Sequence, residues 1–151
     1  MSIILGIDPG AEKSAYVAWD TVSETVEYHE IVSNRTLLLR LRAKTHKQDR
    51  TAIEHLRGFG QKAGNEVYDT CEWVGRFDMD ANIPLLSRKE IVTYLCDSPR
   101  AGDKDVRDAI LYRFGGKEKA IGVKKNPGVL YGIKADEWSA LAVCLYVADK
   151  L

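Results

Sequence analysis

The chain of 151 residues carries 22 basic and 22 acidic residues and is 45% hydrophobic, with a formal net charge of zero. This length predicts a single domain over residues 1–151 with one buried core. No apolar run is long enough to cross a bilayer, and no secretory signal opens the chain, so we expect a soluble cytoplasmic protein without a membrane partner. The balanced charge gives no indication of a nucleic-acid partner, although residues 100–134 hold nine basic residues against four acids.

The three cysteines give no sign of a metal or disulfide framework. Cys71, Cys96 and Cys144 are odd in number and far apart in the sequence, which suits a reducing compartment. Each lies in an apolar, helix-like context, so we predict that all three are buried in the core.

The N-terminal part of the chain predicts three strands and a helix. Residues 3–8 form a short apolar run that ends at a Pro-Gly turn, residues 14–19 form a second run, and alternating apolar residues mark a third strand over 26–31. These strands form an antiparallel meander. A helix over about residues 36–46 has the apolar face needed to cover it.

The rest of the chain alternates between strands and helices. We predict a strand over 50–56, a helix through 67–74, a strand over 83–86, a helix opened by a Ser87/Glu90 capping box, a helix from Asp103 to the Gly115-Gly116 stop, a loop over 117–131 and a final helix over 136–151.

Three acidic residues are candidates for metal-dependent chemistry. Asp8 ends the first strand just before a Gly-containing turn, where a carboxylate has room to meet a ligand, although turn-forming aspartates are also common as plain structure. Glu54 lies in an otherwise apolar strand, where an acid is costly unless it has a partner such as a metal. Asp136 starts the final helix and has the alternative role of an N-cap.

The order of GIDPG, then AIEHL, then a late acid before SALAV resembles the RuvC-type Holliday-junction resolvases of the ribonuclease H-like superfamily. The resemblance covers nearly the whole chain. It implies an α/β, ribonuclease H-like fold, in which a five-stranded mixed sheet has three antiparallel strands followed by parallel ones and is flanked by helices. The compact length and the divergent final motif would suit a bacteriophage enzyme, acting in a bacterial or infected host cell.

By this resemblance Asp8, Glu54 and Asp136 are the catalytic metal ligands. The family has an aspartate at the position of Ser139, and serine is a poorer ligand. Glu137 is adjacent, but one residue along a helix turns the side chain by about 100°. The fourth ligand is therefore left open between Glu137, Ser139 and water.

The same resemblance predicts the residues that contact DNA. Lys89 and Lys104 match basic family positions near the site, with surface solubility as the alternative role. Phe59 matches an aromatic residue that opens base pairs at the junction centre, with packing as the alternative. Three further basic residues of these segments complete the predicted DNA-binding set: Arg57, Lys62 and Arg107. His29 and His46 lack evident partners, which argues against a zinc site or a histidine-based triad.

The implied function is that of a crossover junction endodeoxyribonuclease. Two Mg²⁺ ions per site, with Mn²⁺ able to substitute, would hydrolyse phosphodiesters of four-way and other branched DNA to 5′-phosphate and 3′-hydroxyl ends. Paired cuts require two sites, so we expect a homodimer formed through the helix of Tyr68, Cys71 and Val74. The alternatives are a related nuclease of flaps or structured RNA, a junction-binding protein with reduced cleavage, and a member of the actin-like ATPase superfamily.

Overall fold

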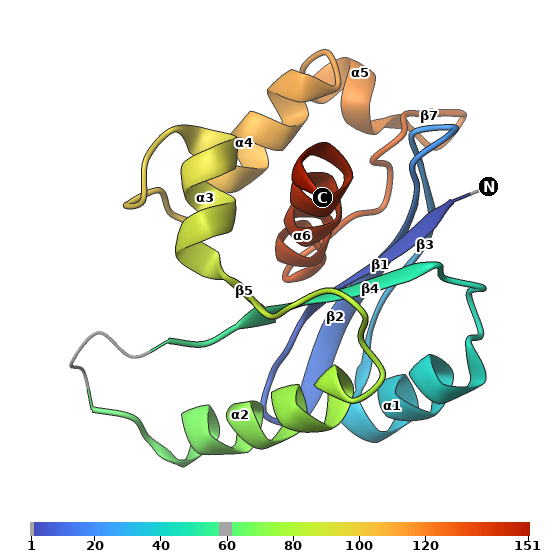
Figure 1. Cartoon of the computed structure of the whole chain (residues 1–151). Helices are drawn as coiled ribbons and strands as arrows, with labels where there is room; N and C mark the ends of the chain where they lie inside the picture. The colour runs from blue at the N-terminus through green and yellow to red at the C-terminus, as the bar shows by residue number, and fades with distance from the viewer. Residues whose placement is uncertain (1, 58–61) are drawn as a thin grey trace.

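The computed structural model describes residues 2–57 and 62–151, and its centre is a five-stranded mixed sheet in the order β3-β2-β1-β4-β5 (Figure 1). The strands are β1 (Ile3–Asp8), β2 (Lys13–Asp20), β3 (Thr25–Ser33), β4 (Arg50–His55) and β5 (Leu86–Ser87). The first three are antiparallel neighbours, whereas β4 runs parallel to both β1 and β5. This arrangement confirms the predicted mixed sheet.

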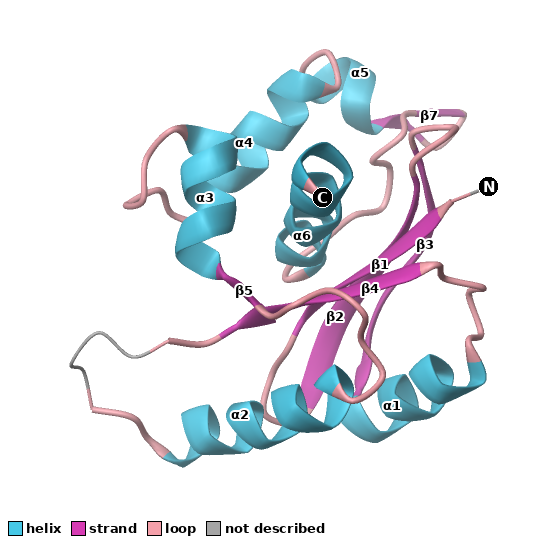
Figure 2. Cartoon of the chain, viewed as in Figure 1, coloured by secondary structure: helices cyan, strands magenta, loops and turns pink. Residues whose placement is uncertain are grey.

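Helices cover the two faces of the sheet unequally (Figure 2). On one face lie α1 (Asn34–Ala43) and α2 (Asn65–Asp78). The other face carries α3 (Arg88–Cys96), α4 (Asp103–Arg113), α5 (Lys117–Ile121) and α6 (Glu137–Lys150). Because α6 contacts β1, β2 and β4, it is the helix that connects the C-terminal part of the chain to the centre of the sheet.

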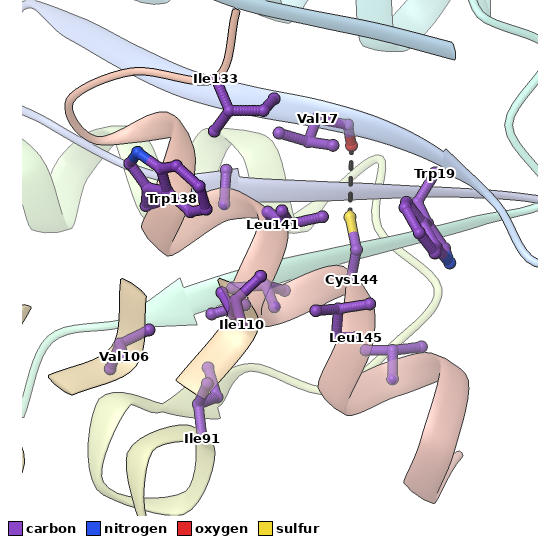
Figure 3. Packing of buried hydrophobic residues seen from close by; sticks show 14 of the residues in the cluster. Val17, Trp19, Ile91, Val106, Ile110, Ile133, Trp138, Leu141, Cys144 and Leu145 are labelled. Carbon is purple, nitrogen blue, oxygen red and sulfur yellow. Dashed lines mark hydrogen bonds between the residues drawn. The ribbon is translucent and has the colours of Figure 1, made fainter. Parts of the chain in front are cut away.

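Helix α6 packs closely against the sheet because residue 6 is a glycine. A β-carbon on Gly6 would lie 2.5 Å from the Ala140 carbonyl oxygen and 2.6 Å from the Cys144 sulfur. The Cys144 thiol is fully buried there and lies 3.3 Å from the carbonyl oxygen of Val17. Figure 3 marks this contact with a dashed line. Small residues at these positions therefore let a helix backbone approach strand β1 directly.

Large apolar side chains complete both cores. On the α6 side, Trp19, Ile110, Leu141 and Leu145 belong to one continuous cluster (Figure 3). On the opposite face Tyr16, Leu37 and Phe77 are among the buried residues of a second cluster. The sheet thus separates two packed layers. The acidic residues of the candidate site lie at the carboxyl ends of β1 and β4, which carry Asp8 and Glu54, and at the start of α6, where Asp136 lies.

Several sequence predictions were wrong. Segment 117–131 is not a loop, because it contains α5 and a short hairpin of β6 (Gly122–Val123) and β7 (Asn126–Pro127). These elements are too short to produce a periodic pattern. Cys71 is exposed and Cys96 half-buried, so only Cys144 of the three is a core residue. The predicted strand over 83–86 is shifted and shortened to β5.

The helix boundaries follow local chemistry. Helix α3 begins with the predicted capping box, in which the Ser87 hydroxyl accepts from the Glu90 amide and the Glu90 carboxylate accepts from the Ser87 amide. Helix α1 ends three residues before the predicted position, because Lys44 adopts a left-handed conformation that terminates it. Among the helices of the described residues, none has the length and apolar character required to span a membrane.

Candidate functional site

The turn after β1 holds Asp8 in a fixed position. The Gly10 amide donates to the Ser14 hydroxyl at 3.1 Å, Ser14 donates to the Asn34 side-chain oxygen at 2.6 Å, and Asn34 donates back to the Gly10 carbonyl at 2.8 Å. A β-carbon at Gly10 would lie 2.2 Å from the Lys13 carbonyl oxygen, so the turn requires glycine. The Pro-Gly turn is thus a rigid support for the carboxylate that precedes it.

Asp8 and Glu54 come together at the carboxyl ends of two parallel strands. Ile7 pairs with Ile53 in the register of β1 and β4, so the next residue of each strand lies at the same edge. Their carboxyl groups are hydrogen-bonded, and burial followed by the charges of Glu54 and Asp136 raises the pKa of Asp8 well above its ordinary value. The side chain of Glu54 is only 8% exposed. Two carboxyl groups that lie close together and are shielded from water create a site that favours the binding of positive charge.

Asp136 brings a third carboxylate to this edge from the N-terminus of α6. It occupies the N-cap position, but within the described part of the chain its side chain makes no capping hydrogen bond. The alternative role as a side-chain cap is thus not observed. Asp136 is exposed and lies near enough to Asp8 to raise its pKa, yet no three His, Cys, Asp or Glu side chains of the described residues are gathered tightly enough to hold a metal.

The donor set fits a divalent cation at the Asp8–Glu54 pair. Carboxylate oxygens are the ligands that Mg²⁺ prefers, and a metal ion would offset the repulsion between the two carboxyl groups. Asp136, whose side chain is exposed, would be the third ligand. A complete two-ion set would need a fourth anionic ligand from positions 137 or 139.

Glu137 is engaged elsewhere. Its carboxylate, 1% exposed, lies 2.9 Å from Nδ1 of His29 on β3 and accepts from the Lys134 amide at 3.0 Å. The expectation that His29 lacks a partner was therefore wrong. It was also wrong for His46, whose Nε2 lies 2.9 Å from the Tyr16 hydroxyl. Both pairings join segments far apart in the sequence, which periodicity cannot reveal.

Ser139 faces the site, and it does so together with Arg88, a residue that was not predicted from the sequence. Nη1 of Arg88 lies 3.3 Å from Glu54 Oε1 and 3.3 Å from Ser139 Oγ, and its Nη2 forms an ion pair with Asp103. The parallel pairing of Glu54 with Leu86 places the residue after β5 at the same edge. This register, which no local sequence pattern reveals, is what brings Arg88 to the site.

Two of the predicted DNA-contacting residues lie next to these acids. Lys104 and Arg107, both on α4, line one hollow together with Asp103, Asp136 and Ser139. Lys104 also lies 3.4 Å from Asp108, and the Arg107 guanidinium lies over the Trp138 ring at 5.7 Å from its centre.

The other predicted DNA contacts lie away from the hollow or outside the described residues. Lys89 is exposed and borders a separate depression with Arg88 and Arg100. Arg57 and Lys62 are exposed on either side of segment 58–61. Phe59 lies within that segment, outside the described residues, so the structure places neither its side chain nor its contacts.

Comparison with known proteins identifies the fold. Neither a family model nor a curated protein matches the sequence. RuvC of T. thermophilus in complex with a Holliday junction substrate superimposes with a TM-score of 0.64 at 15% identity, covering 96% of this chain and 92% of that one. Another T. thermophilus RuvC structure gives 0.62 at 15% identity, with 96% and 95% covered. The chain therefore has the ribonuclease H-like fold of RuvC.

Proposed function

We propose that this protein is a structure-selective, Mg²⁺-dependent endonuclease that resolves four-way DNA junctions. The observation that carries the proposal is the pair formed by the half-buried Asp8 and the buried Glu54 at the carboxyl ends of β1 and β4, with Asp136 near enough to raise the pKa of Asp8. Its support is the match in fold to a protein solved on a Holliday junction substrate. The products would be a 5′-phosphate and a 3′-hydroxyl.

The chemistry follows from the charges that the chain places at this edge. A divalent cation held by Asp8, Glu54 and Asp136 would activate water and neutralise charge on the phosphodiester. The protein itself excludes water from one side, because Glu54 is buried, and leaves Asp136 open to the substrate. The sequence prediction of two ions depends on position 139, where the chain has a serine.

Basic residues near the acids would bind the DNA backbone. Lys104 and Arg107 border the hollow that contains Asp136, so a phosphate there would meet positive charge next to the ligands. Arg57, two residues after β4, and Lys62 are exposed and would contact a second part of the junction. The neutral chain would thus bind DNA through a local surface and not through its net charge.

A homodimer would supply the two cuts that junction resolution requires. On α2, Val67 is 40% exposed and Tyr68 65% exposed, whereas Val74 is buried in the core. The three residues of the predicted dimer contact therefore differ in their environment: Tyr68 and Cys71 are exposed, whereas Val74 is buried in the core. The outward part is available for a two-fold contact with a second copy.

A second candidate function is junction binding with weak cleavage. Ser139 supplies no negative charge, and Arg88 contacts Glu54, a proposed metal ligand. Both features weaken divalent-cation binding relative to a site of four carboxylates. This candidate shares the substrate of the first and differs only in turnover.

A cleavage assay with end-labelled substrates separates the candidates. The purified protein is mixed with a four-way junction, matched linear duplex, a flap and a structured RNA, each in Mg²⁺, Mn²⁺ or EDTA. We expect paired, symmetric cuts in the junction with metal, ligatable nicked products, and no cuts by the Asp8→Asn variant. Junction binding with no cleavage in either metal would support the second candidate, and preference for flap or RNA would contradict both.

A further inference from the structure

Arg88 contacts Ser139, the position at which the candidate site lacks an acidic ligand. As the first residue of α3, it follows directly on β5, whose Leu86 is the register partner of Glu54. Its side chain is 35% exposed, so the guanidinium lies at the boundary between the buried acids and solvent. A phosphate that approaches the acids would therefore reach it.

The contacts of Arg88 join the proposed ligand Glu54 to the odd position Ser139. One nitrogen, Nη1, lies 3.3 Å from both Glu54 Oε1 and Ser139 Oγ, and Nη2 pairs with Asp103. An aspartate at position 139 would meet this guanidinium directly and be neutralised by it. Serine instead accepts a hydrogen bond there and adds no negative charge, so the guanidinium charge is shared only between Glu54 and the exposed Asp103.

A structural ion pair is a poorer account of Arg88. Asp103 is 88% exposed, and exposed pairs contribute about 0–1 kcal/mol to stability. A guanidinium, by contrast, is permanently charged and has a planar set of five N–H donors suited to phosphate oxygens. Because the guanidinium lies beside Glu54, a proposed metal ligand, its charge would act on a phosphate bound at the site.

The formal charges of the site define how much cation it needs. With a cation bound, the three proposed ligands Asp8, Glu54 and Asp136 carry three negative charges and Arg88 one positive charge, so their sum is −3 + 1 = −2. Asp103 is left out of this sum because its side chain is 88% exposed, so that solvent and salt screen its charge. One divalent cation balances this sum. An aspartate at position 139 without the arginine would give −4, which two divalent cations balance.

We infer that Arg88, paired with Ser139, takes the place of a second divalent cation, so that each chain binds one metal ion and uses the guanidinium as its second positive charge toward the phosphate. This inference rests on the proposed function for the identity of the substrate. It does not rest on turnover, because metal stoichiometry is measured on the protein alone.

The test counts bound Mn²⁺ by isothermal titration and by the loss of the free-ion electron paramagnetic resonance signal. The full chain is compared with Arg88→Met, Ser139→Asp and the double variant, and circular dichroism checks that each is folded. We expect one Mn²⁺ per chain in the wild type and two in the double variant. Two in the wild type would overturn the inference and leave the nuclease proposal standing.

The same titration distinguishes failure of the proposed function. No Mn²⁺ bound by the folded wild type would overturn both the inference and the proposed nuclease. One ion bound, together with intact four-way junctions after incubation, supports the stoichiometry and contradicts the nuclease.

Cleavage kinetics test the role of the guanidinium. At saturating Mn²⁺ we expect Arg88→Met to lower the cleavage rate about 10³-fold, the lower end of what an arginine supplies in phosphoryl transfer, while junction affinity changes less than about threefold. Arg88→Lys should recover part of the rate because it keeps the charge. Arg100→Met, an exposed neighbour, is the matched control. A wild-type rate in folded Arg88→Met would contradict the inference.

Discussion

Glu54→Gln should abolish cleavage without weakening the fold. The substitution keeps the shape of the side chain and its ability to bond Asp8, but it removes a negative charge from a place that is only 6% exposed. Loss of a metal-binding charge should remove several kcal/mol of transition-state stabilisation, which corresponds to about a 10³-fold slower cleavage.

The effect on stability has two opposing parts. Removal of the Glu54 charge relieves its repulsion of the Asp8 carboxyl group, which is one of the causes of the raised pKa of Asp8. The lost ion pair with Arg88 costs at most about 1 kcal/mol, because the guanidinium is partly exposed. The free energy of unfolding without metal should therefore rise by about 1 kcal/mol, and the melting temperature by about 3 °C.

Urea denaturation without metal and single-turnover cleavage of a four-way junction measure the two effects. Glu118→Gln, at an exposed position on α5, is the matched control and should change neither. Junction affinity in Ca²⁺ should stay within about threefold for both variants. Wild-type cleavage by Glu54→Gln would refute the site assignment, and a loss of more than about 2 kcal/mol in unfolding free energy would show that Glu54 is a structural partner of Arg88.

Three further predictions concern the fold and assembly. Gly6→Ala should lower the free energy of unfolding by about 1–3 kcal/mol in urea denaturation, because its β-carbon would meet the Ala140 carbonyl oxygen at 2.5 Å; an unchanged midpoint would contradict this. Tyr68→Glu should convert a dimer to a monomer in light scattering, and a monomeric wild type would overturn the expected assembly. Asp149 accepts two hydrogen bonds from Arg113, which hold its pKa below the ordinary 3.8. Asp149→Asn should therefore lower the free energy of unfolding by about 0.5–1 kcal/mol at pH 7, and this difference should shrink as the pH falls below about 4. An equal loss at pH 3 would refute the pairing.

Local sequence patterns predicted most of the strands and long helices because these elements carry clear periodicities, whereas the parallel part of the sheet was implied by the family resemblance. The first strand was predicted at its observed bounds, residues 3–8, and the capping box of Ser87 and Glu90 was found as predicted. The error at 117–131 arose where five-residue and two-residue elements leave too few positions for a period to show. The glycine pair before this segment marks the end of α4 but does not predict the type of the next element.

The candidate site was predicted less completely because its remaining members depend on pairings between distant segments. Asp8 and Glu54 could be found because each is an acid at an unusual place in its own strand. Arg88 could not, since its importance comes from the parallel register of β4 and β5. The contact between His29 and Glu137 likewise could not be predicted, because it depends on how β3 and α6 lie next to each other in the fold.

The contact at Gly6 connects the core to the proposed chemistry. It sets the separation of β1 and α6, and these two elements carry Asp8 and Asp136. The ligand spacing is thus adjustable from the interior: a change in side-chain volume at position 144 would move the helix relative to the strand. Since Mg²⁺ binds oxygen at about 2.0–2.1 Å and Ca²⁺ at about 2.3–2.6 Å, directed evolution could alter ion preference through a residue that never touches the ion.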